Sequence, residues 1–395
     1  MRNVPKLRFK EFSGEWEEIK LKEILEFKNG INASKEQYGK GIKFINVLDI
    51  LNNDFIIYDN IIGKVDIDEK TLEKYSVNYG DILFQRSSET REEVGMANVY
   101  LDDKIATFGG FVIRGKKIAN YVPTFINKVL KTDLARNEIT SKSGGSTRYN
   151  VGQDILNEVQ IIIPKLEEQE KIGNFLSSVD KKISIVEEKL NLFKEYKKGI
   201  MQKIFKQELR FKDENGNNYP QWEEKRLGEV SDIIMGQSPS SSEYNEEFKG
   251  LPLIQGNADC KNRKIYPRMY TTEITKESFP NDIIMTVRAP VGAISFSDIH
   301  SCIGRGVCAI RNANKFIYHY LIKLEDSWDK LAQGSTFTAV NSNDIKNLVI
   351  KLPCLEEQQK IADFLSAIDD KIENISDNLK NLKEFKKGLL QQMFV

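Results

Sequence analysis

The amino-acid sequence predicts an α+β protein with two globular domains separated by two long antiparallel coiled-coil helices, arranged as an internal pseudo-twofold repeat. The first observation is that residues 353–394 align with residues 164–205 without a gap, and 21 of the 42 positions are identical. The second is an apolar pattern of alternating four- and three-residue spacing in both copies. The third is that short strand-like runs and turn residues precede each copy. The chain therefore consists of two copies of one unit.

Four segments follow from this repeat. We expect a first globular domain at residues 1–163, a first spacer helix at 164–206, a second globular domain at 207–352 and a second spacer helix at 353–395. At about 1.5 Å per residue, a helix of about 40 residues would be about 60 Å long.

The apolar pattern of the two helical segments is the a/d seam of a coiled coil. Amphipathic helices packed on separate cores are the alternative, but such helices rarely keep a 3.5-residue period this long. The seam residues, which we expect at the helix and partner interface, are Ile172, Leu176, Val179, Ile183, Leu190, Lys197, Ile361, Leu365, Ile368, Ile372, Leu379 and Lys386.

The seam lysines indicate the direction of pairing. In a parallel pair in matched register, Lys197 and Lys386 would meet as like charges in a poorly solvated seam. An antiparallel pair moves each lysine toward the N-terminal end of the other helix, so we predict antiparallel pairing. The acidic residues available there are Glu167, Glu168 and Glu170, or Glu356, Glu357 and Asp363.

The first globular domain is expected to contain short strands, a few helices and many loops. A helical stretch is predicted at residues 17–27, and strand-like runs at 43–47, 55–58, 81–84, 112–114 and 159–163. The second domain repeats the plan. The paired landmarks are Phe44-Ile45-Asn46 with Leu253-Ile254-Gln255, Gly80-Asp81-Ile82 with Asn281-Asp282-Ile283, Gly145-Ser146-Thr147 with Gly334-Ser335-Thr336, and Gln153-Asp154-Ile155 with Asn343-Asp344-Ile345.

Composition is that of an ordinary soluble globular protein, with 395 residues, 40% of them hydrophobic and 29% charged. No apolar run approaches the ~20 residues of a membrane span and no signal peptide is evident, so a cytoplasmic location is expected. The 58 basic and 58 acidic residues cancel. Zero net charge counts against a simple nucleic-acid binder, but permits one whose basic residues are local or whose partners contact the phosphates.

The sequence offers no self-contained active site. Residues 110–117 resemble a phosphate-binding G-x4-G-K loop, but a lysine replaces the required Ser/Thr, so a strand followed by a basic turn is expected. The four cysteines and two histidines fit no zinc spacing, which predicts reduced thiols and no metal site. Hydrolase motifs are absent, and so is the Pro-Pro pair that a methyltransferase of base amino groups would carry.

Basic residues interleaved with aromatics and glycines form clusters in both globular domains. A single exposed arginine or lysine is usually only solvated, so the clusters carry the argument. The planar fork of arginine suits guanine edges and phosphate oxygens. The candidate DNA-binding residues are Arg86, Arg91, Lys116, Lys117, Lys142, Arg148, Lys261, Arg263, Lys264, Arg268, Arg288 and Arg305, with Ser146, Thr147, Ser335 and Thr336 of the two Gly-Ser-Thr words.

Over essentially its whole length the chain resembles the DNA specificity subunits of type I restriction–modification systems. The family's conserved regions are matched by L-E-E-Q-x-K-I-x-x-F-L-S-x-x-D-x-K-I at residues 166–183 and 355–372, and by K-E-[YF]-K-K-G at 194–199 and 383–388. The second globular domain also resembles a common subclass through G-Q-S-P-S at 236–240, R-A-P-V-G at 288–292 and C-I-G-R-G at 302–306. The first domain lacks the last two words.

This resemblance implies a non-catalytic DNA-binding subunit. Each globular domain would read one half of a bipartite, asymmetric site in double-stranded DNA, while the helices set the spacing between the halves. The helices would also dock two modification subunits, which bind S-adenosylmethionine and methylate adenine N6. Restriction subunits that use ATP and Mg would join them, and this chain itself would bind no cofactor.

Two other classes of function remain open from the residues alone. One is a coiled-coil scaffold whose variable domains bind proteins, which the neutral charge suggests. The other is a self-contained nuclease or methyltransferase with an unfamiliar active site.

Overall fold

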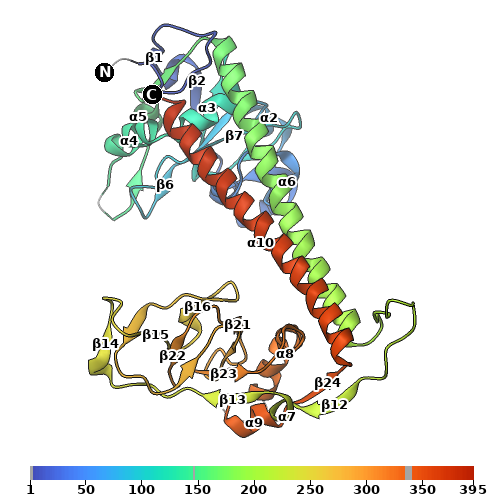
Figure 1. The fold of residues 1–395 in the computed structure, drawn as a ribbon. Coiled ribbons are helices and arrows are strands. Elements are labelled where there is room, and N and C mark those ends of the chain that lie inside the picture. Colours follow the sequence, from blue (N-terminus) through green and yellow to red (C-terminus); the bar gives the residue numbers. More distant parts are fainter. Residues whose placement is uncertain (1–2, 146, 334–339) are drawn as a thin grey trace. The chain divides into compact units, whose positions relative to one another are not determined.

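The computed structural model describes residues 3–145, 147–333 and 340–395. It forms two compact units, one made of Met1–Glu187 with Asn378–Val395 (unit 1) and one of Glu188–Asp377 (unit 2). Each unit is a β-rich body joined to parts of two long helices, α6 (Leu166–Phe205) and α10 (Leu355–Gln392) (Figure 1). The chain is thus α+β, as the sequence predicts. No helix in the described part of the chain is long and apolar enough to cross a membrane.

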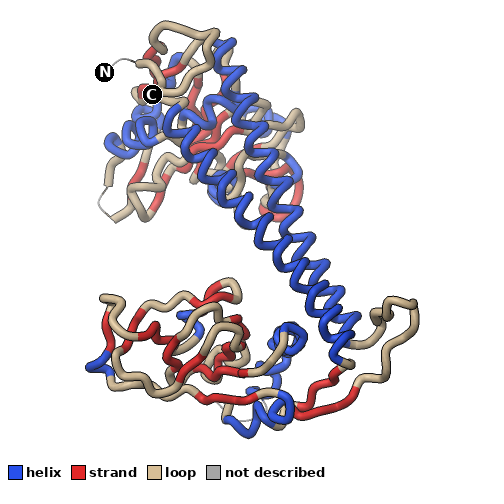
Figure 2. Tube along the Cα trace, viewed as in Figure 1, coloured by secondary structure: helices blue, strands red, loops and turns tan. Residues whose placement is uncertain are grey.

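Unit 1 contains short strands joined by many loops (Figure 2). A four-stranded antiparallel sheet has the order β2 (Leu25–Asn29), β9 (Val112–Lys117), β5 (Ile82–Gln85), β7 (Ala97–Val99). A second sheet has the order β4 (Lys64–Val65), β3 (Tyr38–Ile45), β8 (Thr107–Phe108). Two further pairs are β1 (Glu17–Lys20) with β11 (Gln160–Ile163), and β6 (Ser87–Ser88) with β10 (Tyr149–Asn150). The helices are α1 (Val47–Leu51), α2 (Glu69–Lys74), α3 (Pro123–Val129), α4 (Asp133–Lys142) and α5 (Gln153–Asn157).

Unit 2 follows the same plan with larger sheets. The first has the order β13 (Asp232–Met235), β23 (Val307–Arg311), β20 (Ile283–Thr286), β21 (Ile294–Phe296), β17 (Lys264–Ile265), β16 (Cys260–Lys261). The second has the order β14 (Tyr244–Asn245), β18 (Met269–Thr271), β15 (Leu251–Ile254), β22 (Ser301–Ile303), β19 (Glu277–Ser278). β12 (Glu223–Arg226) pairs with β24 (Val349–Leu352), as β1 pairs with β11. The helices are α7 (Leu227–Val230), α8 (Lys315–Gln333) and α9 (Ser342–Lys346).

The two long helices pack antiparallel. In unit 1 the first half of α6 shares a hydrophobic core with the end of α10 and with Met393 and Phe394, which follow α10 and are buried. In unit 2 the end of α6, including Ile204 and Phe205, shares a core with the first half of α10. The predicted seam supplies these contacts, since Ile172, Leu176, Val179, Ile183, Leu190, Ile361, Leu365 and Ile368 are buried and Ile372 and Leu379 are partly buried against the cores.

The predicted partners of the seam lysines are wrong. Lys386 pairs with Asp180 and Lys197 pairs with Asp369, instead of with the glutamates near the helix N-termini. Two of those glutamates are already paired with arginines near the start of each globular domain. Arg8 makes a two-bond contact with Glu168 at 2.8 and 2.7 Å, and Arg210 makes the same contact with Glu357 at 3.2 and 2.6 Å.

Two local predictions also fail. Residues 17–27 are not a helical stretch: β1 pairs in register with β11 and a single 3-10 turn leads into β2, because pairing along the sheet overrides local propensity. Residues 55–58 form no strand and contribute only one isolated bridge, between Ile56 and Tyr100. By contrast, residues 112–117 form strand β9, which confirms a strand instead of a phosphate-binding loop, although the turn precedes it.

Candidate nucleic-acid interface

Three of the sequence motifs of the second domain lie together at one end of unit 2. Strands β13, β15, β20 and β22 end there and β23 begins there. Gln237 N donates to Ile303 O at 2.9 Å and Val287 N donates to Gly306 O at 2.9 Å, so the words GQSPS, RAPVG and CIGRG adjoin. We refer to residues 236–238, 255–256, 287–288 and 304–306 as the loop end of unit 2.

Glycines make this convergence possible. A Cβ at Gly236 would lie 2.1 Å from Gly304 O, and a Cβ at Gly306 would lie 1.9 Å from Gln255 O. These are distances that a side chain cannot occupy, so the close approach of the backbones requires glycine at both positions.

Two arginines are free at the loop end of unit 2. Arg288 and Arg305 are exposed, and neither side chain forms an ion pair or hydrogen bond with any residue that the structure describes. The backbone N of Arg305 is held by Ser238 Oγ at 3.1 Å, which fixes where this side chain starts. Both guanidinium groups are therefore available to a ligand with acceptor oxygens or nitrogens.

The other basic candidates of unit 2 differ in their surroundings. Arg263 is paired with Glu325 of α8, and Lys264 is paired with Glu373 of α10. Arg268 Nε lies 2.8 Å from the buried Asp259 carboxylate. Lys261 is exposed, at the start of the two-residue turn that joins β16 to β17. The structure thus does not gather these residues with Arg288 and Arg305 into one set of free cations.

Unit 1 builds a loop end with the same backbone bonds. Gly109 N donates to Ile45 O at 3.0 Å, as Gly304 N donates to Ile254 O at 2.8 Å. Arg86 N donates to Phe111 O at 2.9 Å, as Val287 N donates to Gly306 O. We refer to residues 30–32, 46, 86–87 and 109–111 as the loop end of unit 1. Arg86 and the exposed Phe111 thus replace Val287 and Gly306 of unit 2.

Further predicted residues lie beside the loop end of unit 1. In the antiparallel β6–β10 pair, Tyr149 faces Ser88 and Asn150 faces Ser87, so the exposed Thr147 and Arg148 continue beyond Ser88, on the side away from Arg86. Arg91 Nε donates to Thr140 O at 3.1 Å, and Lys142 pairs with Glu138 on the same helix. Ser146, Ser335 and Thr336 lie outside the described residues.

Lys116 and Lys117 lie away from this loop end. They are at the far end of β9 from Val112, and five residues of strand span about 16 Å. Lys117 Nζ donates to Tyr121 O at 3.0 Å and is partly buried there. Lys116 and Lys117 were grouped with the other basic residues because they are near in sequence. An extended strand carries residues that are near in sequence far apart in space.

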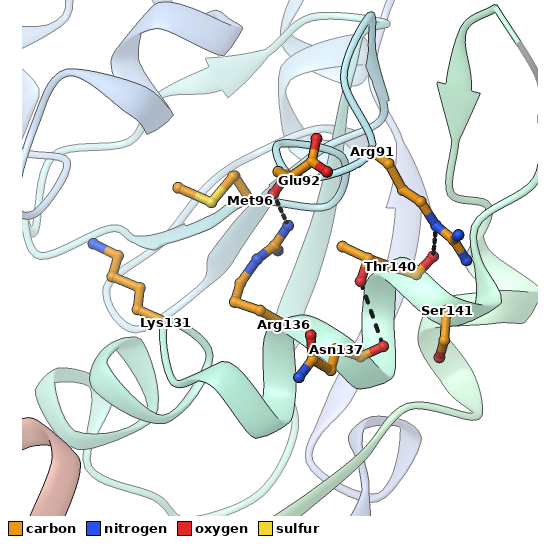
Figure 3. A pocket seen from close by; sticks show the side chains of 8 residues that line it. All are labelled: Arg91, Glu92, Met96, Lys131, Arg136, Asn137, Thr140 and Ser141. Atoms are coloured by element: carbon orange, nitrogen blue, oxygen red, sulfur yellow. Dashed lines mark hydrogen bonds between the residues drawn. The ribbon is translucent and has the colours of Figure 1, made fainter.

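Sequence reasoning missed Lys131 and Arg136, which line a pocket of about 750 Å³ in unit 1 together with Arg91, Glu92, Thr140 and Ser141 (Figure 3). Neither residue stands in a cluster of basic and aromatic residues, so the sequence carried no local signal for them. Tertiary packing of α4 against the loop at residues 91–96 brings them together with Arg91.

Two segments, residues 13–195 and 219–384, match the model of the type I restriction modification DNA specificity domain. The chain belongs to this family. It is 32% identical to a putative type I restriction enzyme MjaX specificity subunit of Methanocaldococcus jannaschii, over 98% of this chain and 95% of that protein. It is a DNA specificity subunit of a type I restriction–modification system, and is not itself the catalyst of that enzyme complex.

Solved structures are similar to this specificity subunit over nearly its full length. One, from work on complex assembly and conformational transition of the type I R-M system, has a TM-score of 0.58 and 25% identity, covering 96% of this chain and 97% of that one. The other, a type I S subunit from M. genitalium, has a TM-score of 0.64 and 18% identity, covers 99% of both chains and shows the fold alone.

Possible metal ligands in this specificity subunit are dispersed. Within the described residues there is no group of three or more His, Cys, Asp or Glu side chains that could hold a metal ion. His300 is paired with Glu277, and the described cysteines are free thiols.

Proposed function

We propose that each unit of this specificity subunit reads one half of a bipartite, asymmetric site in double-stranded DNA through its loop end. The observation that carries the proposal is that the two loop ends share a backbone hydrogen-bond pattern but differ in side chains. A shared frame places the reading residues alike in both units, and different side chains then select different bases.

The side chains of the two loop ends differ in chemistry as this proposal requires. Unit 2 offers Arg288 and Arg305, whose free guanidinium groups suit guanine N7 and O6. Unit 1 offers Arg86 together with Phe111, which is 66% exposed and can contact an apolar group such as a thymine methyl. The remaining candidates beside these loops, such as Arg148, suit phosphate contacts that fix orientation.

The long helices are proposed to set the spacing of the two half-sites and to dock two modification subunits. Tyr196 of α6 and Phe385 of α10 occupy equivalent positions in the repeat, and their exposed fractions are 52% and 54%. Exposed aromatics on helices otherwise rich in charge are typical anchors of protein interfaces. S-adenosylmethionine would then bind on the modification subunits, and ATP and Mg on the restriction subunits that join them.

Genome-wide mapping of methylated adenine tests the proposal. In a strain that carries this chain with its modification subunits, we expect one bipartite motif, with two different half-sites and a fixed gap, that disappears when this chain is deleted. A motif without a gap, or one with two identical half-sites, would contradict the reading of one half by each unit. If a filter-binding assay with the modification subunits present showed no sequence-selective retention of DNA, a protein-binding scaffold would be favoured instead.

A further inference from the structure

The pocket beside α4 in unit 1 is separate from the loop end, and we propose that it binds a phosphate group. Three of the side chains that line it are cationic, Arg91, Lys131 and Arg136, and one is acidic, Glu92 (Figure 3). The proposal extends the proposed function, because the phosphate would come either from the DNA backbone or from a free phosphorylated molecule.

Arg136 is held in place and keeps one donor unused. Its Nη2 donates to Glu92 O at 2.9 Å and to Val94 O at 2.6 Å, which fixes the plane of the guanidinium. Its Nη1 is buried and has no hydrogen-bond partner among the described residues. A buried donor left unpaired destabilises the fold, so a ligand oxygen that accepts from it would offset that cost.

Lys131 adds a cation to the pocket, and its Nζ donates to Asp54 O at 3.4 Å. Desolvation of its ammonium, followed by the charges of Lys128 and Lys386, lowers the pKa of Lys131 to about 8, against the opposing effect of Asp54 and Asp180. Asp180 is already paired with both of those lysines, at 2.5 Å each. An anion in the pocket would stabilise the charged form of Lys131.

The chemistry of these donors favours phosphate among anions. A guanidinium and an ammonium supply several charged N–H donors, which suits an anionic group with several acceptor oxygens. The volume of about 750 Å³ exceeds that of a single phosphate, so the group would be part of a larger molecule. Arg91, which lines the pocket, follows Arg86 of the loop end by five residues, so a backbone phosphate of bound DNA is one source of the group.

Two substitutions in the full-length chain test the pocket. Lys131→Met changes an exposed residue and should leave folding intact, while Arg136→Met removes the unused donor. The matched control is Lys104→Met, an exposed cation of unit 1 that pairs with Asp59 and does not line the pocket. Far-UV circular dichroism and thermal melting check that each variant folds.

The first readout is affinity for DNA duplexes of unrelated sequence, with modification subunits present, measured by fluorescence anisotropy at several salt concentrations. If the phosphate belongs to DNA, Lys131→Met and Arg136→Met each weaken binding about 3- to 10-fold for all sequences and reduce the salt slope by about one. Sequence preference should not change. An equal loss in Lys104→Met would overturn the proposal, because the effect would then be one of net charge.

The second readout is calorimetric titration of the chain alone with inorganic pyrophosphate. Binding that both pocket variants lose, with unchanged DNA affinity, would support the pocket and assign it to a free phosphorylated molecule. No change in either readout would overturn the proposal. Because this titration uses no DNA, it also separates failure of the pocket from failure of the DNA-reading role.

Discussion

Lys386 of α10 forms an ion pair with Asp180 of α6, with Nζ and Oδ1 2.5 Å apart. The same pair recurs in the other half of the repeat, where Lys197 Nζ lies 2.5 Å from Asp369 Oδ1. Both lysines occupy seam positions, so each desolvated charge is matched to one carboxylate on the opposite helix. The antiparallel arrangement thus satisfies both lysines, which a parallel pairing would bring together.

The two ion pairs should differ in their contribution to stability. Asp180 also pairs with the buried Lys128, and its own side chain is only 10% exposed. Burial alone would raise the pKa of Asp180, but the hydrogen bonds from Lys128 and Lys386 outweigh it and hold the pKa below its ordinary value. Asp180→Asn leaves two cations without a carboxylate and should lower the free energy of unfolding by about 3–5 kcal/mol.

Asp369→Asn is the matched control. Its side chain is 38% exposed, and its second neighbour, His319, is neutral because burial and then Lys197 lower the pKa of that histidine to about 3. Only one cation, Lys197, loses its partner, and the carboxylate that is removed is partly solvated, so the loss should be smaller than that of Asp180→Asn. Urea titrations measure both variants, and equal losses would show that burial does not decide the strength of these pairs.

Trp222 and Trp16 provide a second matched comparison. Trp222 Nε1 donates to the buried Glu357 carboxylate at 3.1 Å, whereas Trp16 Nε1 has no partner among the described residues. Replacing tryptophan by phenylalanine removes the indole N–H and about the same side-chain volume at both positions. Trp222→Phe should therefore destabilise the chain more than Trp16→Phe, by about 1–2 kcal/mol. A larger loss for Trp16→Phe in denaturant titrations would contradict the role of this hydrogen bond.

Arg288 should discriminate between bases. We expect Arg288→Ala to weaken binding to the cognate site by about 1–3 kcal/mol, with the loss confined to duplexes that keep the contacted base. Arg263→Ala is the control, because Arg263 is committed to Glu325 and should not alter base preference. Binding to a set of singly substituted duplexes measures both. A uniform loss across all duplexes would identify Arg288 as a phosphate contact instead.

Tyr196 and Phe385 should each govern one partner subunit. Tyr196→Asp and Phe385→Asp place a charge on an exposed aromatic position without touching the cores, so folding should be retained. Each single variant should bind one modification subunit fewer than the native chain, and the double variant none. Analytical ultracentrifugation of the mixed subunits gives the stoichiometry, and two bound copies in the double variant would place the docking surface elsewhere.

Features with a long period were predictable from the sequence. The heptad pattern placed both long helices, and α6 and α10 begin at Leu166 and Leu355, within two residues of the predicted starts. The paired landmarks were also informative, since Ile45 and Ile254 accept equivalent hydrogen bonds from Gly109 and Gly304. These features depend on periodicity and on repeated words, which a sequence shows directly.

Contacts between distant side chains were not predictable. Lys197 was expected near glutamates at a helix N-terminus but lies on Asp369, because the register of two antiparallel helices is set by packing of whole cores. Arg263 was grouped with Arg288 by composition, but it forms an ion pair with Glu325 of α8. Lys131 and Arg136 gained their significance only from the pocket that α4 forms with a distant loop.

Exchange of one globular domain tests the central claim most directly. Residues 207–352 would be replaced by the equivalent segment of another family member with a known bipartite site, and the methylated adenines of the host genome mapped. Our account predicts that one half-site changes to that of the donor, while the other half-site and the gap stay the same. A change in both half-sites, or in neither, would contradict it.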